Sequence, residues 1–168
     1  LTITNGAATG TGINPKDGSG GGILNQGLLE LGQVAIRSNL ATIKGGGLAN
    51  AADATATINQ TTIDGNRVSG TYGVGGGGIQ NDGVLVLNDS TISRNVADGL
   101  ALGNSSLNGG GGIRNLEKMR LINSTISGNT ALRGDGGGIL NYGDPTRQDA
   151  EMYFVTIAFN TALTGLGG

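Results

Sequence analysis

The chain has 168 residues, of which 35 are glycine and 2 are proline, and its formal net charge is −2. That length is enough for one domain with a core, and the near-neutral charge gives no electrostatic reason to expect nucleic acid or an anionic membrane as a partner. The sequence contains neither cysteine nor histidine, which excludes a disulfide framework, a thiolate metal site, a cysteine nucleophile and a Ser-His triad.

Two short signatures alternate five times along the chain. The first is a glycine corner, in which three glycines precede an aliphatic residue and an asparagine: Gly20–Asn25, Gly45–Asn50, Gly76–Asn81, Gly110–Asn115 and Gly136–Asn141. The second holds an isoleucine three residues before a closing asparagine: Val34–Asn39, Thr61–Asn66, Ser90–Asn95, Ser124–Asn129 and Val155–Asn160. Such a repeat is typical of solenoids, propellers and arrays.

The apolar residues within each repeat recur at every second position, as in Leu28–Leu31 and Val84–Leu87. This period predicts short β-strands, about three per repeat. A propeller blade needs four strands and about 40 residues, whereas successive glycine corners here lie at most 34 residues apart. The sequence therefore predicts an all-β fold, a right-handed parallel β-helix (solenoid) of about five coils with three short strands per coil, stacked ~4.8 Å apart.

Alignment of the repeats on the closing asparagine gives aliphatic columns that we expect to face the interior. The columns are Ile36, Ile63, Ile92, Ile126 and Ile157; Leu31, Ile58, Leu87, Leu121 and Met152; and Leu29, Ala56, Leu85, Met119 and Ala150. The positions between them should face outward, among them Ala35, Thr62, Thr91, Thr125 and Thr156, and Glu30, Thr57, Val86, Arg120 and Glu151. The two asparagine columns should stack and hydrogen-bond at two corners, because asparagine tolerates a left-handed backbone and its amide both donates and accepts.

The alternation of "GGGI.N" with "STIS.N" resembles the right-handed parallel β-helix repeats of large secreted and surface proteins of bacteria. It is distantly similar to the chlamydial polymorphic outer-membrane protein repeats, which alternate a Gly-Gly-Ala-aliphatic motif with a Phe-x-x-Asn motif; here isoleucine replaces the phenylalanine in all five copies. The resemblance covers nearly the whole chain and implies the architecture and a surface-exposed role.

The two ends of the sequence look cut within a repeat. The chain begins at Leu1 with "LTITNG", like the tail of one coil, and closes with "GLGG", like the start of another glycine corner. We therefore expect residues 1–168 to be a single segment of a longer solenoid or stacking array. No stretch approaches the ~20 apolar residues of a membrane span, so membrane insertion of this segment is not expected.

The residue patterns assign no catalytic residue and no cofactor. The glycine runs lack the Lys and Ser/Thr of a phosphate loop, so tight corners explain them better. Arg120 and Glu151 on adjacent rungs predict a surface ion pair rather than an acid/base couple. Asp64 should have Arg37 and Ser93 as rung neighbours, not a second carboxylate.

The same residue patterns disfavour a dedicated calcium site and an ice-binding face. Asp53, Asp82 and Asp144 follow glycine corners out of register, which allows an incidental calcium ion but not a calcium-binding roll. An ice-binding face would need a second threonine row beside the outward one. That row instead reads Asp64, Ser93, Ser127 and Ala158.

Short motifs and variable loops supply the remaining candidates. Acceptor sequences for N-glycosylation occur at Asn59, Asn88, Asn104 and Asn123. The loops are predicted to leave one corner, directly after each closing asparagine, and insertions at one corner of a solenoid often form its recognition face. The recognition candidates are Arg67, Tyr72, Asp98, Asn104, Arg133 and Asp135, the last two belonging to an Arg-Gly-Asp tripeptide.

These features together favour an extracellular or cell-surface role that is structural or adhesive: a rigid stalk, fibre or surface layer with a displayed loop face. The expected partners are neighbouring coils or like subunits, and surface glycans. The alternative is a carbohydrate-active β-helix, similar to pectin lyases, that acts on polysaccharide.

Overall fold

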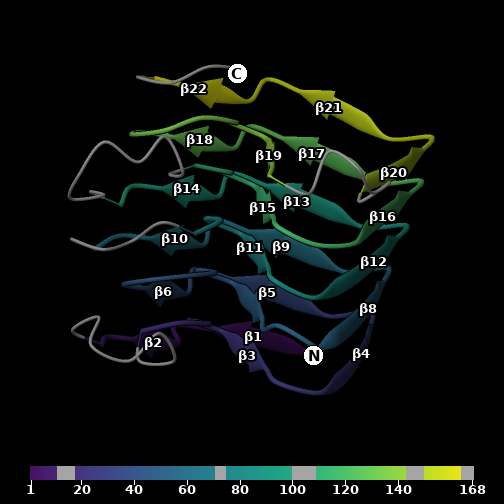
Figure 1. Cartoon of the computed structure of the whole chain (residues 1–168), viewed down its shortest axis with the longest axis horizontal. Coiled ribbons are helices and arrows are strands. Elements are labelled where there is room, and N and C mark those ends of the chain that lie inside the picture. Colours follow the sequence, from purple (N-terminus) through teal and green to yellow (C-terminus); the bar gives the residue numbers. More distant parts are fainter. Residues whose placement is uncertain (11–17, 71–74, 100–108, 143–149, 164–168) are drawn as a thin grey trace.

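A computed structural model of the chain describes residues 1–10, 18–70, 75–99, 109–142 and 150–163. These residues form one parallel β-solenoid whose strands rise from the N-terminus to the C-terminus (Figure 1), in about four turns rather than five. Every strand pairs in parallel with the equivalent strand one coil away, and none of the described residues is helical. No helix long and apolar enough to cross a membrane is therefore found in the described part.

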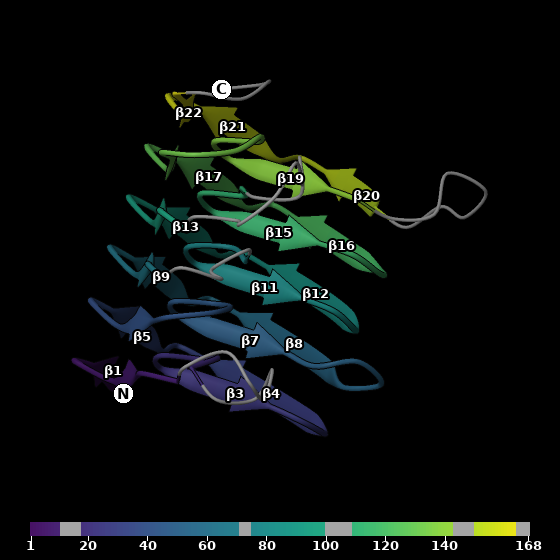
Figure 2. The same cartoon turned by 60° about the vertical axis from the view of Figure 1, so that its left-hand side comes forward.

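Each coil contains four strands rather than the expected three, so the strands form four sheets. The glycine sheet consists of β3 (Ile23–Asn25), β7 (Leu48–Asn50), β11 (Ile79–Asn81), β15 (Ile113–Asn115) and β19 (Ile139–Asn141). The long-strand sheet consists of β4 (Leu28–Gly32), β8 (Thr55–Asn59), β12 (Val84–Asn88), β16 (Met119–Ile122) and β20 (Ala150–Tyr153). Figure 2 shows these two sheets side by side.

The other two sheets have six strands each. The threonine sheet consists of β1 (Thr2–Thr4), β5 (Ala35–Arg37), β9 (Thr62–Asp64), β13 (Thr91–Ser93), β17 (Thr125–Ser127) and β21 (Thr156–Ala158). The short-strand sheet consists of β2 (Ala7–Ala8), β6 (Leu40–Ala41), β10 (Arg67–Val68), β14 (Val96–Ala97), β18 (Thr130–Ala131) and β22 (Thr161–Ala162).

The short-strand sheet corrects the expected path of the variable loops. The chain does not leave the solenoid directly after the closing asparagine but first pairs two more residues, as in β10 and β14. Val68 and Ala97 of these strands, with Ala41, form a small buried cluster of their own. Two residues are too few to show an alternating pattern, so this strand could not be predicted from the sequence.

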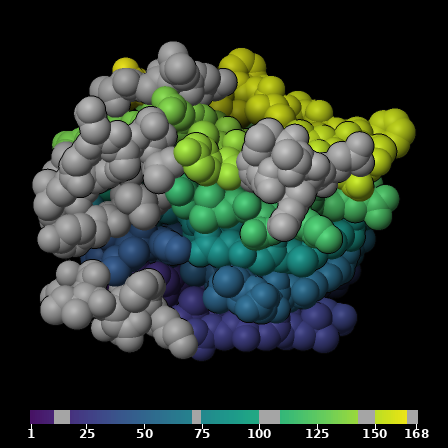
Figure 3. Space-filling view, viewed as in Figure 1, coloured from purple at the N-terminus to yellow at the C-terminus, as the bar shows by residue number. Residues whose placement is uncertain are grey.

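The predicted aliphatic columns form the core. The strand register pairs Ile36 with Ile63, Ile63 with Ile92 and Ile92 with Ile126, and each of these side chains is fully buried. The two columns from the long-strand sheet pair as expected as well, and their members other than Met152 pack into the same cluster. Met152 and Ile157 of the last coil, which were expected to face the interior, are 42% and 48% exposed, because no coil of the described residues stacks on theirs. In the space-filling view the coils appear as successive bands over this core (Figure 3).

Both asparagine columns form continuous hydrogen-bonded ladders. In the first ladder, Asn66 Nδ2 donates to Asn95 Oδ1 at 3.0 Å and to the carbonyl oxygen of Ile36 at 2.9 Å, while Asn66 Oδ1 accepts from the backbone N of Asn39 at 3.0 Å. The same arrangement recurs in Asn95 and Asn129. The first ladder consists of Asn39, Asn66, Asn95, Asn129 and Asn160, and the second of Asn25, Asn50, Asn81, Asn115 and Asn141.

A third polar ladder lies at the start of the threonine-sheet strands. The backbone N of Thr61 donates to Ser90 Oγ at 3.0 Å, and the backbone N of Ser90 donates to Ser124 Oγ at 3.2 Å. Each hydroxyl in turn donates to a backbone carbonyl two residues earlier in the chain. These three buried hydroxyl groups satisfy backbone donors inside the corner, which is why Ser or Thr opens the signature in the three middle copies.

The left-handed backbone at the corners belongs to the residues that precede the ladders, not to the asparagines as expected. Ser38, Arg94 and Phe159 have φ values of 53°, 53° and 56°, and each precedes an asparagine of the first ladder. None of the ladder asparagines has a positive φ. A second column of left-handed residues precedes the hydroxyl ladder: Gln33, Gln60, Asp89, Asn123 and Phe154.

The glycine corners are glycine because neighbouring backbones approach too closely for a side chain. A Cβ atom on Gly46 would lie 2.4 Å from the carbonyl oxygen of Gly77 in the next coil. One on Gly47 would lie 2.9 Å from the carbonyl oxygen of Gly78 and 3.0 Å from Asn66 Nδ2. Close stacking of coils, rather than phosphate binding, accounts for these residues.

Candidate functional site

Three of the predicted recognition residues come together on the outer surface. The guanidinium of Arg67 donates to Asp98 Oδ2, and Arg133 Nε lies 3.7 Å from Asp98 Oδ1. They belong to three successive coils, and both arginine side chains are about half exposed. Asp135 pairs with Gly109 in an isolated bridge, whereas Tyr72 and Asn104 lie outside the described residues.

The described acceptor asparagines lie on the rim of the long-strand sheet. Asn59 and Asn88 share a column, as predicted, and Asn88 Nδ2 donates to Asn59 Oδ1 at 2.8 Å. Asn123 lies one position away at an exposed left-handed corner, where its Nδ2 donates to Asp89 Oδ1 at 2.6 Å. The amide nitrogens of Asn88 and Asn123, to which a glycan would be attached, are thus engaged in hydrogen bonds. Asn104 lies outside the described residues.

A groove follows the corner between the glycine sheet and the long-strand sheet. It is made of hollows of about 110, 400 and 200 Å³ that share walls: Ala52 and Asp82 line the first two, and Val84 and Lys118 line the last two. We call this continuous depression the corner groove. Its ionic wall residues are Lys44, Asp53, Asp82, Glu117, Lys118, Arg120 and Glu151.

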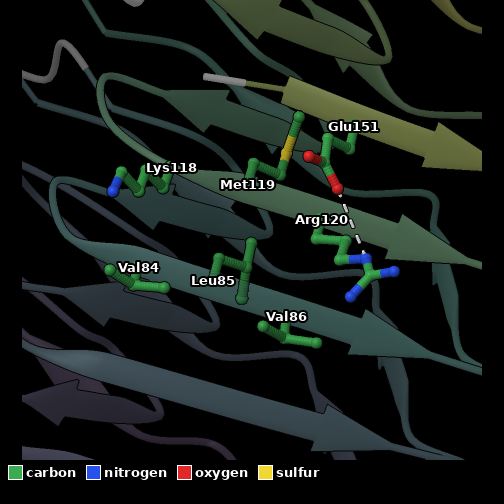
Figure 4. A pocket seen from close by; sticks show the side chains of 7 residues that line it. All are labelled: Val84, Leu85, Val86, Lys118, Met119, Arg120 and Glu151. Atoms are coloured by element: carbon green, nitrogen blue, oxygen red, sulfur yellow. Dashed lines mark ion pairs between the residues drawn. The ribbon is translucent and has the colours of Figure 1, made fainter. Parts of the chain in front are cut away.

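The two ends of the corner groove differ in the number of contacts that hold their carboxylates. At one end, Lys44 Nζ donates to Asp82 Oδ2 at 2.6 Å and Gln80 Nε2 donates to Asp82 Oδ1, so two contacts hold this carboxylate. At the other end, Arg120 Nε lies 3.4 Å from Glu151 Oε2 across adjacent strands (Figure 4). The predicted surface ion pair between Arg120 and Glu151 is therefore confirmed.

The outer side of the glycine sheet is buried at its centre, which the sequence did not indicate. Gln80 is fully buried and Arg114, its neighbour in register, is 4% exposed. Burial lowers the pKa of the Arg114 guanidinium, and the nearby Asp82 carboxylate opposes that shift. Asp82 thus joins a buried polar group to the open groove.

Asp64 confirms its expected rung neighbours but has a further partner. It pairs in register with Arg37 and Ser93, and Ser93 Oγ donates to Asp64 Oδ1 at 2.8 Å. The guanidinium of Arg94 donates to both oxygens of Asp64, at 2.9 and 2.7 Å, and these bonds hold the pKa of Asp64 below its ordinary value. Arg94 lies at a left-handed corner just after the strand, so the alternation along the strand does not predict where its side chain points.

The described aromatic residues all lie in the last coil and are exposed: Tyr142, Tyr153, Phe154 and Phe159. Phe154 and Phe159 occupy left-handed corner positions, where a bulky side chain is unusual and strained. Their exposed fractions are 89% and 91%, so packing does not explain them. Tyr153 lies next to the groove residue Arg120, whose guanidinium is 5.5 Å over the centroid of its ring.

The other candidate sites find no further support in the described residues. The described ranges contain no group of three or more acidic side chains that could hold a metal ion. Asp53 and Asp82 both line the middle hollow of the corner groove, while Asp144 lies outside the described residues. The outward row beside the threonines reads as predicted, with Asp64 next to Ser93, Ser127 and Ala158.

The corner groove was missed because its walls come from five successive coils and do not repeat. One signal was present: Asp82 and Glu117 follow second-ladder asparagines by one and two residues, and Asp53 follows one by three. Residues after one stacked corner must lie near one another in space. No protein-family model, curated protein or solved structure matches this chain. The resemblance stated above is confirmed only for its architecture, the parallel β-solenoid.

Proposed function

We propose that this chain is a structural and adhesive segment of an extracellular solenoid, which forms a rigid stalk, fibre or surface layer and displays side chains on its outer faces. The observation that carries the proposal is the set of three polar ladders that run alongside one aliphatic core. The two asparagine ladders join each coil to the next, and the hydroxyl ladder joins the middle coils, so bending would break buried hydrogen bonds. The buried ladders and core make the solenoid stiff, and binding depends on the side chains at its surface.

Two features support the adhesive part of the proposal. The Arg67–Asp98–Arg133 group presents two half-exposed guanidinium groups at the loop corner, and the corner groove presents a mixed ionic wall. The proposed partners are neighbouring coils or like subunits along the solenoid axis, and glycans at the surface. The extracellular location rests on the resemblance to secreted β-helix repeats.

Immunogold electron microscopy of the native source material, with an antibody raised against this chain, tests the proposal. We expect the label on stalks, fibres or a surface layer. Label confined to the cell interior, or to free particles of no defined shape, would contradict it.

A carbohydrate-active enzyme is the second candidate, because Asp53, Asp82 and Glu117 line one open hollow of about 400 Å³. Glycoside hydrolysis requires a pair of carboxyl groups across the scissile bond. Incubation with neutral and acidic polysaccharides, followed by an assay for new reducing ends and unsaturated products, separates the candidates. Turnover that disappears in Asp82→Asn and Glu117→Gln variants would establish the enzyme; the structural proposal expects none.

A further inference from the structure

The corner groove is lined by both signs of charge at close spacing. Its cations are Lys44, Lys118 and Arg120, and its carboxylates are Asp53, Asp82, Glu117 and Glu151. We infer that the corner groove binds a neutral glycan chain, laid across four successive coils. The inference rests on the proposed adhesive function and places a binding site on the side chains of the groove instead of the loop corner.

The balance of charges selects the ligand class. A polyanion would meet three carboxylates in the middle hollow, and a polycation would meet Lys118 and Arg120 at its edge. Sugar hydroxyl groups donate and accept, so a neutral glycan can use both kinds of charged group through charge-assisted hydrogen bonds. A ligand with many hydroxyl groups and no net charge therefore suits the wall as a whole.

The floor of the groove suits the apolar face of a sugar ring. Val84 is 36% exposed, and Val86 lies in register with Arg120 on the same outer face. Next to the groove, the ring of Tyr153 lies beneath the groove residue Arg120 and adds aromatic surface. Apolar and aromatic surface flanked by a few placed polar groups is the usual make-up of a small-molecule site.

The polar groups at the open end of the groove are not needed for the fold. Within the described residues, no carboxylate lies within ion-pair distance of the Lys118 ammonium. Arg120 and Glu151 form a pair whose side chains are 53% and 43% exposed, and such pairs contribute little to stability. Figure 4 shows the Lys118 and Arg120 side chains extending in opposite directions along the strand, so a ligand between them meets a cation at each end.

The second asparagine ladder holds the backbone of this site rigidly. Asn50 Nδ2 donates to the carbonyl oxygen of Val84 at 3.0 Å, and Asn81 Nδ2 donates to that of Lys118 at 3.0 Å. Both amides are fully buried, so these groove residues are fixed before a ligand arrives. Preorganisation of this kind reduces the ordering cost of binding.

Isothermal titration calorimetry with five hexasaccharides tests the inference on the intact chain. Maltohexaose, cellohexaose and mannohexaose are the neutral probes, and hexagalacturonate and a glucosamine hexamer are the charged comparators. We expect at least one neutral probe to bind, and both charged probes to bind at least ~10-fold more weakly, since one mispaired charge is worth roughly one tenfold step.

Matched variants locate the binding. Glu151→Gln and Lys118→Ala should each weaken the neutral probe by about tenfold. Glu30→Gln is the control, because Glu30 occupies the same outward column as Glu151 but lies outside the groove. It should leave affinity unchanged, and thermal melting should show that all three variants remain folded.

The inference is overturned if no neutral hexasaccharide binds, if a charged probe binds as tightly, or if Glu30→Gln and Glu151→Gln weaken binding equally. Any of these outcomes leaves the structural role intact, because that role is tested by where the labelled chain is found. Conversely, if the chain binds a neutral glycan but is located inside the cell, the binding site in the groove is supported and the adhesive function is contradicted.

Discussion

Replacement of Asn95 by alanine removes four hydrogen bonds from the middle of the first ladder. Nδ2 donates to Asn129 Oδ1 at 3.0 Å and to the Ile63 carbonyl at 2.9 Å, while Oδ1 accepts from the backbone N and the Nδ2 of Asn66 at 2.9 and 3.0 Å. Asn129 Oδ1 keeps a donor in the backbone N of residue 95, and Asn66 Nδ2 keeps the Ile36 carbonyl. The backbone N–H of Asn66, which is fully buried, loses its acceptor.

The expected loss of stability follows from the hydrogen bonds that the substitution removes. One buried backbone donor without an acceptor costs roughly 1–3 kcal/mol, and the lost amide bonds add about 1 kcal/mol. We therefore expect Asn95→Ala to lower the free energy of unfolding by about 3 kcal/mol, measured by urea denaturation followed by circular dichroism. Asn88→Ala is the control: it removes one half-buried bond and should cost less than about 1 kcal/mol. Equal losses in the two variants would refute the ladder as a source of stability.

The isosteric Asn95→Asp variant tests the same reasoning through pH. Its second carboxylate oxygen would face the acceptors Asn129 Oδ1 and the Ile63 carbonyl, in place of an amide that donates to both. Burial and these acceptors raise the pKa of the new carboxyl group in the folded state. The destabilisation should be complete above that raised pKa and should decrease as pH falls toward the ordinary value of about 4. Destabilisation independent of pH would contradict this.

Three further changes address the corners, the surface and the core. Gly46→Ala places a Cβ atom 2.4 Å from a carbonyl oxygen and should lower the free energy of unfolding by about 3 kcal/mol or more. In the control Gly27→Ala the new Cβ atom meets no atom within 4 Å, and the free energy of unfolding should change by no more than about 0.5 kcal/mol. Comparison of the urea midpoints of the two variants checks both values. Asp64 has a lowered pKa because Arg94 donates hydrogen bonds to it. Its contribution to the stability of the folded state, at most about 1 kcal/mol, is therefore present above pH ~4 and is lost below it. The Asp64→Asn variant should lack this part of the acid dependence of unfolding. Ile92→Asp puts a carboxylate at a fully buried position and should cost about 4 kcal/mol or more, seen as loss of cooperative thermal melting.

The interior of the solenoid was predictable because each of its positions recurs with the same chemistry. Ile36, Ile63, Ile92 and Ile126 occupy one register position, and period-two alternation identifies the side on which they lie. The asparagines were predictable for the same reason. Their amides stack and hydrogen-bond as expected, but the left-handed backbone assigned to them was wrong, since the left-handed residue at the corner is the one before, such as Ser38 or Arg94. The residues that precede the asparagines vary in type from coil to coil, so alignment of the repeats does not show that they share a left-handed backbone conformation.

Features with too short a pattern, or confined to single coils, were not predictable. The short-strand sheet has two residues per strand, too few for a period, and the hydroxyl ladder begins with a residue that also suits a β-strand. The buried Arg114 belongs to an outward column whose other members include Ala49 and Gln80, so its burial reflects the local covering of one face. The corner groove likewise combines residues that have no equivalents in neighbouring coils.

The ladders and the groove are linked through the same amides. Asn81 stacks on Asn115 and donates to the Lys118 carbonyl, so a change at Asn81 would alter stability and groove geometry together. Glu151 lines the groove and its side chain is 43% exposed, so its replacement separates binding from folding. An outward column can therefore change residue by residue, as from Thr57 to Val86 to Arg120, while the inward columns and ladders stay constant. This separation lets a parallel solenoid acquire a binding surface on any coil without loss of its core.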